Sequence, residues 1–462
     1  MLRIVGLSPN QDSQVDADGS RLDATREVLG ANLDFHGTNS SYGSHAWHPF
    51  PAKFPPQLPE FVIRHLSEPG DTVFDPMLGS GTTLIEALRL GRRAIGCDID
   101  PLSRMIATAK FTPVDPDAVL REGTGIIDGA CDDYHRFRRK LQEGLELRFD
   151  EGTYKFIQYW FLPQQQLELF ALLQRIEALP EGGTRDFLQV VFSSTIIAKS
   201  GGVSLARDLA HTRPHRDIQK TPPSAFTEFG KRLERNIATF GKHELSSVSA
   251  GASSHYNGDC DLAARESRCL ASIHDASAAD TGLPSSSVDL IVTSPPYANN
   301  AIDYMRAHKF SLVWFGWKIA DLSRIRSQYL GHDAISGVRG LGLPDQCEDT
   351  LLKLADRDRK KSLSLRRYFE EMQSVIREMW RVLRSGKAAV IVVGSSRIKG
   401  LDVETHKGLA AIGEDAGFDL AGTGKRQLDR DKRMMPARWG KRGQSQIEER
   451  MHEEYVIGLV KS

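Results

Sequence analysis

Two stretches of the chain alternate short apolar runs with segments of helical periodicity. Residues 72–75 predict a strand, residues 82–90 carry apolar side chains at helical spacing, and residues 93–98 predict a second strand. The same rhythm returns with the apolar run 288–293. A strand, a glycine turn, a helix and a second strand in this order predict the opening of a doubly wound, Rossmann-like α/β sheet.

The remaining pattern divides the chain into a core and two insertions. Residues 115–250 carry mostly helical spacing, and residues 319–365 are charged and contain glycine. Residues 368–383 predict an amphipathic helix, and residues 455–460 a closing strand. The resulting divisions are a polar leader with one short helix near residues 24–29 (1–40), the cofactor half of the core (41–114), a mostly helical insertion (115–250), the catalytic strand (251–318), a charged insertion (319–365), and the C-terminal strands with a basic segment (366–462).

Composition narrows the class of protein. Hydrophobic residues make up 40% and charged residues 26%, as in folded globular chains and unlike disordered ones. The 60 Lys and Arg balance the 60 Asp and Glu, so a polyanion would have to bind a local basic patch. Five cysteines without a Cys-x-x-Cys pair argue against a zinc knuckle and fit a reducing compartment. No apolar run approaches the ~20 residues of a membrane helix, so we expect a soluble, cytoplasmic protein.

The first candidate site is the glycine turn after residue 74. Gly79 and Gly81 allow the backbone to approach a ligand, and the helix that follows offers free N–H groups. A dinucleotide fingerprint is incomplete because position 84 is Leu, and a phosphate P-loop fails because no Lys follows the glycines. By itself the turn also fits an ordinary strand-to-helix connection.

Asp98 ends the second strand, about 20 residues after the glycine turn begins, where an acid accepts hydrogen bonds from ribose. An Asp here also serves as a helix N-cap. Together with the acid Asp75 beside the glycine turn, Asp98 favours a ligand that carries a nucleoside.

The third candidate is the sequence Ser294-Pro295-Pro296-Tyr297 at the end of a buried strand. Two prolines fix the backbone and leave neighbouring carbonyls free to accept hydrogen bonds. Ser294 adds a hydroxyl and Tyr297 a flat ring. An exocyclic amine on an aromatic base needs this combination of acceptors and a stacking surface, although a proline-stiffened loop is the plainer interpretation of the prolines alone.

In combination, these motifs resemble those of S-adenosylmethionine-dependent DNA methyltransferases that methylate amino groups. The resemblance implies a methyltransferase sheet with S-adenosylmethionine as cofactor and double-stranded DNA as partner, and it leaves open whether a partner restriction endonuclease exists. It covers about half the chain, including residues 48–55, which resemble a segment that closes over the cofactor. By this resemblance Asp75 holds the methionine ammonium, Asp98 the ribose and Asp275 the adenine amine. The other implied cofactor contacts are Lys53, Phe54, Gly79, Ser80, Gly81 and Thr82.

The implied catalytic residues are Ser294, Pro295, Pro296 and Tyr297, acting on a base that has left the duplex. Carbon-5 cytosine methylation is disfavoured because no Cys follows a Pro. Serine in the first position resembles cytosine-N4 enzymes more than adenine-N6 enzymes. Adenine-N6 methylation, RNA amino-methylation and a non-enzymatic nucleic-acid-binding module stay open as alternatives.

Local basic clusters are the candidates for DNA binding. Residues 425–442 hold eight Lys or Arg against two Asp, a second cluster lies near residue 211, and a third at 135–140. The residues singled out are Arg207, Arg213, Arg216, Lys425, Arg426, Arg433, Arg438 and Lys441. Insertion 115–250, with 319–365 as a second candidate, is expected to recognise the target, or else to serve as a scaffold or dimer element.

Overall fold

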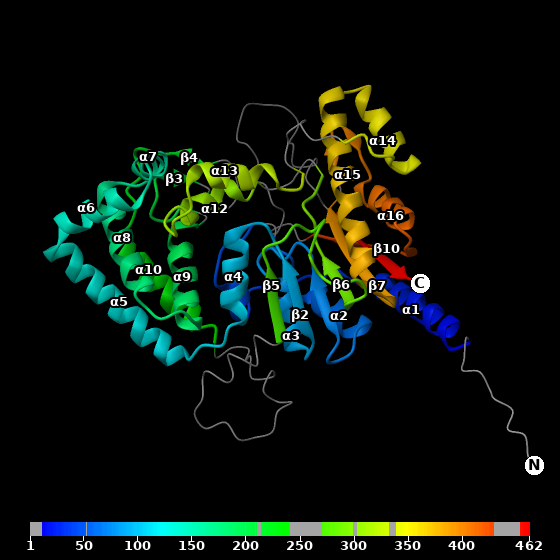
Figure 1. The fold of residues 1–462 in the computed structure, drawn as a ribbon, viewed down its shortest axis with the longest axis horizontal. Coiled ribbons are helices and arrows are strands. Elements are labelled where there is room, and N and C mark those ends of the chain that lie inside the picture. Colours follow the sequence, from blue (N-terminus) through cyan, green and yellow to red (C-terminus); the bar gives the residue numbers. More distant parts are fainter. Residues whose placement is uncertain are drawn as a thin grey trace, which may run out of the picture.

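A seven-stranded sheet crosses the protein in the order β10-β11-β7-β6-β1-β2-β5 (Figure 1). The computed structural model describes residues 12–51, 53–198, 200–207, 209, 214–240, 270–298, 303–331, 339–394, 396–428 and 453–462. The strands are β1 (Thr72–Asp75), β2 (Arg93–Cys97), β5 (Ala271–His274), β6 (Val288–Thr293), β7 (Leu383–Gly394), β10 (Asp419–Gln427) and β11 (Glu453–Lys461). In this sheet β11 is antiparallel to the other six strands, which run parallel to one another. The predicted doubly wound, Rossmann-like α/β fold is therefore confirmed.

The central strands form where the sequence pattern places them. Strands β1 and β6 have the predicted bounds, and every residue in both is buried. Continuous apolar runs of this kind form parallel strands that are covered on both faces. Their carboxyl ends, at Asp75 and Thr293, lie side by side because Val73 and Phe74 pair with Leu290 and Ile291.

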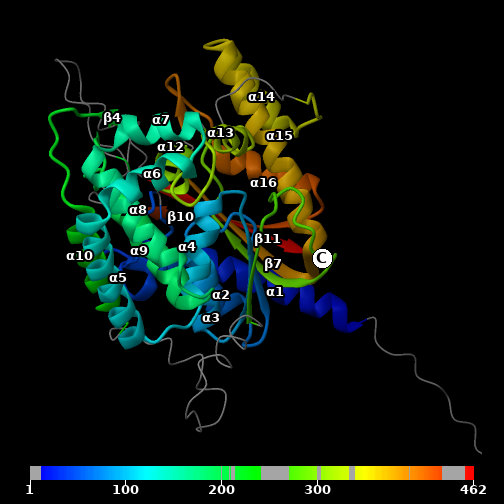
Figure 2. The same ribbon diagram turned by 60° about the vertical axis from the view of Figure 1, so that its left-hand side comes forward.

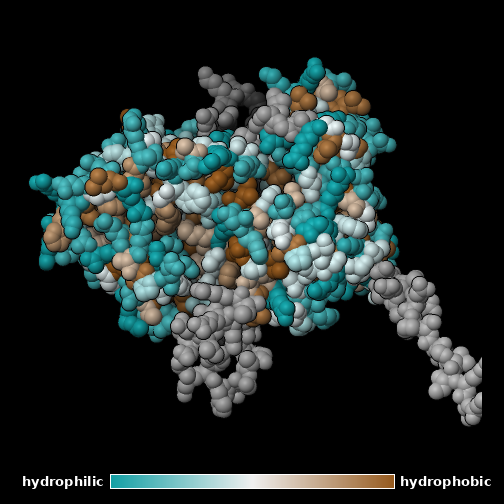
Figure 3. Space-filling view, in the orientation of Figure 1, coloured by the Kyte–Doolittle hydropathy of each residue, from teal (hydrophilic) through white to brown (hydrophobic). Residues whose placement is uncertain are grey.

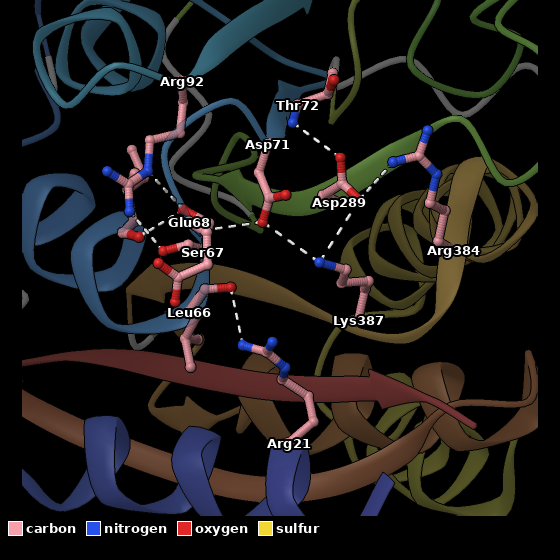
Figure 4. Close-up of polar contacts among 11 residues, drawn as sticks. Arg21, Leu66, Ser67, Glu68, Asp71, Thr72, Arg92, Asp289, Arg384 and Lys387 are labelled. Atoms are coloured by element: carbon pink, nitrogen blue, oxygen red, sulfur yellow. Dashed lines mark hydrogen bonds and ion pairs between the residues drawn. The ribbon is translucent and has the colours of Figure 1, made fainter. Parts of the chain in front are cut away.

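A polar network connects the strands at the other end of the sheet, at the amino ends of β1 and β6 (Figure 4). The Asp289 carboxylate accepts a hydrogen bond from the Thr72 amide at 2.9 Å and from Arg384 at 2.5 Å. Lys387 of β7 lies 3.3 Å from Asp71, which precedes β1. Three strands are thereby tied together at the end that faces away from the glycine turn.

Helices cover both faces of the sheet. One face packs on α1 (Asp12–Gly30), α2 (Gln57–Leu66) and α3 (Thr82–Arg89). The other face packs on α15 (Arg359–Val382) and α16 (Thr405–Asp415), with α14 (Asp345–Ala355) against both helices. A short 3-10 helix (Gly43–Ala46) and two small strands, β8 (Arg397–Ile398) and β9 (Leu401–Asp402), lie in the connections.

Two expectations about the ends of elements were wrong. The polar leader contains α1, which is far longer than the predicted short helix and belongs to the core, because Val28, Leu29 and Leu33 are buried against the sheet. Helix α15 begins at Arg359, so the predicted boundary at residue 365 falls inside it. Leu365 is buried on the same apolar face as the rest of α15, and this face continues the helix through the charged stretch.

The segment between β2 and its neighbour β5 forms a helical lobe with a core of its own (Figures 1 and 2). Its helices are α5 (Pro116–Arg136), α6 (Arg138–Arg148), α7 (Glu151–Trp160), α8 (Pro163–Glu177), α9 (Gly183–Ile196) and α10 (Ala225–Ile237), and β3 (Ala206–Arg207) and β4 (His215–Arg216) form a small ladder. No helix in the described ranges is long and apolar enough to cross a membrane.

Three helices join the lobe to the sheet. Helix α4 (Pro101–Phe111) contacts β5 on one side and α9 on the other, and α12 (Met305–Leu312) contacts α4 and α9. Helix α13 (Ile319–Ser327) packs on α7 and α12. In the space-filling view, hydrophobic residues gather mainly in the middle of the face, between lobe and sheet (Figure 3). The lobe is therefore packed against the edge that carries β5 and β2.

Candidate active site

Asp75 is the last residue of β1 and is 3% exposed. Its Oδ1 accepts hydrogen bonds from the Thr293 hydroxyl at 2.7 Å and from the Met77 amide at 3.1 Å. Burial raises the pKa of the Asp75 carboxyl to about 6. Among the salt bridges of the described residues, none pairs Asp75 with a cation. A buried carboxylate in this state fits a ligand that brings its own positive charge, such as the ammonium of a methionine.

The two glycines of the turn after β1 both have a left-handed backbone. Gly79 has a φ of 48° and Gly81 a φ of 79°. A Cβ on Gly81 would lie 2.9 Å from the Ala107 Cβ, so the turn packs directly on α4. The Gly79 amide donates to Asp98 Oδ2 at 3.0 Å. Residues 79–82 thus join the carboxyl end of β1 to the acid that follows β2.

Asp98 and Asp100 divide the two roles that the sequence left open for Asp98. Asp100 caps α4 by accepting from the amides of Leu102 and Ser103, so the helix N-cap is Asp100 and not Asp98. Burial first, and then the charge of Asp100, raise the pKa of the Asp98 carboxyl to about 7. Asp98 is partly exposed beside the glycine turn. This position suits an acceptor for ribose hydroxyls.

The segment around Phe50 lies over the glycine turn. A Cβ on Gly79 would be 3.5 Å from the Phe50 ring. The Phe50 ring also stacks on Tyr304, which precedes α12, with a centroid distance of 5.1 Å. Pairing of this segment with α12 was not evident in the sequence, because the two are about 250 residues apart.

Lys110 is buried beside the turn, and Lys53, which is partly exposed, is near enough to act on its charge. Burial lowers the pKa of Lys53 to about 8, and burial followed by the charge of Lys53 lowers the pKa of Lys110 well below its usual value. Lys110 Nζ donates to the Ser80 carbonyl at 2.7 Å, whereas Phe54 packs against the apolar core of the α1–α3 face. Sequence reasoning missed Lys110, whose signal was a single charge on an otherwise apolar helix face.

Asp275 directly follows β5, so it lies at the same sheet edge as Asp98. Its carboxylate accepts two hydrogen bonds from Arg104, at 2.6 and 2.8 Å, and its side chain is 71% exposed. Arg104 also donates to the Asp98 carbonyl at 2.7 Å. The predicted contact of Asp275 with adenine stays a prediction, and Arg104 is a neighbour that the sequence did not single out.

The segment Ser294–Tyr297 leaves the carboxyl end of β6, next to the end of β1. Thr293, directly before it, is the residue that bonds Asp75. The Tyr297 hydroxyl donates to Glu454 Oε1 at 2.8 Å, and burial followed by the charge of Glu454 raises the pKa of Tyr297 well above its ordinary value. The structure therefore brings the predicted cofactor turn and the predicted catalytic segment together at one edge.

The predicted DNA-binding residues differ in their exposure, and four of them lie outside the described residues. Arg426 is 5% exposed and pairs with Glu454, so it is not on the surface where a phosphate contact was expected, because its position in β10 faces inward. Lys425 is half-exposed and lies 2.7 Å from Glu453. Those outside the described residues are Arg213, Arg433, Arg438 and Lys441.

Two predicted DNA-binding residues, Arg207 of β3 and Arg216 of β4, are exposed on the helical lobe. Arg207 bonds Asp217 through Nε at 2.7 Å, and the Arg216 guanidinium lies 4.3 Å from the centre of the Tyr159 ring. In the third cluster, Arg136 and Arg139 pair with acids one helical turn away. Their binding to DNA stays a prediction.

Comparisons with known proteins find similarity to DNA methyltransferases. A family model described as DNA methylase matches residues 15–108, which include the segment around Phe50, β1, the glycine turn and β2. The type II methyltransferase M.MvaI of Kocuria varians is 24% identical over 414 residues, covering 84% of this chain and 86% of the relative. The type II methyltransferase M.BsoBI of Geobacillus stearothermophilus is 23% identical over 380 residues, covering 77% and 69% of the two chains.

A shorter match is closer in sequence. The type II methyltransferase M.MjaII of Methanocaldococcus jannaschii is 41% identical over 71 residues, which cover 15% of this chain and 13% of the relative. The two long matches thus extend through the lobe and both halves of the sheet, whereas the match to M.MjaII is confined to a short block.

Proposed function

Since the chain belongs to the amino-methylating DNA methyltransferases of the N4/N6 family, which use S-adenosylmethionine, we propose that it methylates cytosine N4 within a specific DNA sequence. The observation that carries the proposal is the contact between Thr293 and Asp75, 2.7 Å long. It places the first residues of the catalytic segment beside the acid that would hold the cofactor.

The cofactor site fits the donor chemically. Asp75 supplies a buried carboxylate for the ammonium. Of residues 79–82 at the start of α3, Gly79 and Gly81 already donate their amides to Asp98 and to the Leu78 carbonyl, so the amides of Ser80 and Thr82 would meet the cofactor carboxylate. Asp98 accepts from the ribose, and Phe50, Lys53 and Phe54 lie on the segment that covers the turn. The cofactor supplies an activated methyl group on sulfur.

The chain's own residues prepare the nucleophile. An exocyclic amine is a weak nucleophile because its lone pair is conjugated with the ring. Hydrogen bonds from the amine to the Ser294 hydroxyl and the Pro295 carbonyl would direct that lone pair toward the methyl carbon. Tyr297 would stack on the extruded base. Catalysis is then mainly positioning, which can contribute ~7–11 kcal/mol, and it needs no covalent enzyme intermediate.

The choice of cytosine rests on Ser294. A serine in the first position of the catalytic segment resembles the cytosine-N4 enzymes, whereas adenine-N6 enzymes more often carry Asp or Asn there. We further propose double-stranded DNA as substrate, the helical lobe as the reader of the target sequence, and a restriction endonuclease of the same specificity as the functional counterpart. The type II names of the relatives support this last assignment.

One experiment tests the reaction and the base together. The protein is incubated with S-adenosylmethionine labelled in the methyl group and with unmethylated duplex DNA or, separately, with RNA, and the digested nucleosides are identified. We expect labelled N4-methylcytosine from DNA. Labelled N6-methyladenine would contradict the assignment of cytosine as the target base but not the mechanism. Label found only in RNA would contradict the proposal that DNA is the substrate.

A further inference from the structure

The hydroxyl of Tyr297 is held by a residue from the far end of the chain. It donates to Glu454 Oε1 at 2.8 Å, across a sequence separation of 157 residues. Glu454 is 8% exposed. From the sequence, only the ring of Tyr297 had a role, as a surface for stacking, and its hydroxyl had none.

Strand direction explains why Glu454 reaches the catalytic edge. Strand β11 runs against its neighbours, so it begins where the parallel strands end. Glu454 pairs in register with Gly394, the last residue of β7, and β7 lies directly beside β6. A residue near the start of β11 is therefore close to the segment that leaves β6.

Glu454 also contacts a buried cation, Arg426. Arg426 of β10 is the cross-strand partner of Glu454, and its Nη1 lies 3.3 Å from Glu454 Oε2. The side chains are 5% and 11% exposed. A buried ion pair is expensive to desolvate and contributes little to stability compared with apolar residues of the same volume. Its position at the catalytic edge points to a role beyond stability.

The Tyr297 hydroxyl is suited to donate. Burial raises its pKa well above the ordinary value, and the negative charge of Glu454 raises it further. The hydroxyl thus keeps its proton, and one oxygen of Glu454 accepts it while the other faces Arg426. The tyrosine ring is fixed at both ends, by the backbone after Pro296 and by this hydrogen bond.

We propose that Glu454 and Arg426 are positioning residues that hold the Tyr297 ring in the orientation needed to stack on the extruded base. The proposal rests on the methyltransferase function proposed above. Arg426 lies against the second carboxylate oxygen of Glu454, and Glu454 restrains the ring through its bond to the hydroxyl. Without this restraint, the ring can turn away from the base before the base arrives, and fewer encounters place the amine against the methyl group.

The test compares single-turnover methylation rates on DNA, with cofactor affinity measured by calorimetry. Glu454→Leu removes the acceptor, and Tyr297→Phe removes the donor with the loss of one oxygen atom. Both variants are expected to lose about tenfold in rate, equivalent to ~1.4 kcal/mol in activation free energy, with cofactor affinity unchanged. Glu454→Gln keeps an acceptor oxygen and should recover part of the rate. Arg426→Met should be slow, and Arg426→Lys should recover part of the rate.

The matched control is Glu453→Gln, one residue earlier in β11. Glu453 is also a paired acid, but it bonds Lys425 and has no bond to Tyr297, so its rate should equal that of the wild type. The double variant Tyr297→Phe with Glu454→Leu should be no slower than either single variant, because the same hydrogen bond is missing in all three.

Several outcomes overturn the proposal. They are a wild-type rate in Glu454→Leu or in Tyr297→Phe, and a double variant in which the two rate reductions multiply. A wild-type protein that methylates no DNA contradicts the proposed function instead, so the two failures are distinguishable.

Discussion

Thr293 donates a hydrogen bond to Asp75 across 2.7 Å, although 218 residues separate them in the chain. Each residue ends a buried parallel strand, and the strands β1 and β6 are neighbours. Two motifs that the sequence presents as separate thereby become one site. The carboxyl ends of parallel strands are where open α/β sheets bind ligands.

Asp75→Asn should abolish cofactor binding in calorimetry, because the amide cannot neutralise an ammonium. The free energy of unfolding of this variant, relative to that of the wild type, should depend on pH. The folded pKa of Asp75, about 6, lies above its unfolded value of 3.8, so the ionised carboxyl destabilises the fold as pH rises through 6. This shift in pKa corresponds to a loss of ~3 kcal/mol in the free energy of unfolding once the carboxyl is ionised.

Denaturant melts of the cofactor-free proteins measure this effect. Relative to the wild type, Asp75→Asn should gain stability at pH 8 compared with pH 4. A stability difference that does not vary with pH would show that Asp75 is not destabilised by burial.

Cofactor affinity of the wild type should rise with pH between about 5 and 8, as Asp75 and Asp98 ionise. The hydrogen bond from Thr293 lowers the pKa of Asp75. Thr293→Val removes it and should therefore move the lower part of this profile to higher pH. Calorimetric titrations at closely spaced pH values provide the measurement, and an unmoved profile in Thr293→Val would contradict the assignment.

Ser294→Ala should lose most turnover and keep cofactor affinity, since one acceptor for the amine is gone and the cofactor site is intact. Labelled methyl transfer at saturating cofactor gives the rate. Full activity in this variant would refute the role of the catalytic segment in activating the amine.

Tyr297→Ala removes the stacking surface and should weaken capture of the extruded base. Stacking on an aromatic side chain is worth ~1–3 kcal/mol per base in proteins that bind single strands. We expect a rise of the KM for DNA together with a lower rate, at unchanged cofactor affinity. Unchanged kinetics would remove Tyr297 from the mechanism.

Gly81→Ala should destabilise the fold by ~1–3 kcal/mol, from a left-handed backbone and a Cβ 2.9 Å from Ala107. Gly91→Ala is the matched control, because Gly91 has a φ of 75° but its nearest neighbour, Pro69 Cβ, lies 3.9 Å away. Equal destabilisation in the two melts would show that the close approach to α4 has no cost.

Neutralising Arg433, Arg438 and Lys441 should weaken DNA binding and flatten its salt dependence, by ~0.9 in log–log slope for each phosphate that the variant no longer neutralises. Binding isotherms at several salt concentrations measure the slope. An unchanged slope would show that Arg433, Arg438 and Lys441 do not contact phosphates.

The local elements and the chemistry that they carry could be predicted from the order of the residues. Strands β1 and β6 follow from short buried apolar runs, the turn from Gly79 and Gly81, and the catalytic segment from the two prolines. Each of these signals is contained in fewer than ten consecutive residues, because backbone preference and hydrophobic period are local properties.

Which of these residues come into contact depends on how the strands and helices pack. Arg426 was predicted to contact phosphate from its place in a basic run, yet the alternation of β10 turns it inward toward Glu454. A single charge among apolar helix residues did not show that Lys110 would bond the Ser80 carbonyl, and Glu454 carried no local signal. The bond between Tyr297 and Glu454 depends on the reversed direction of β11. Such contacts depend on strand order and direction, which are set by the packing of the whole sheet.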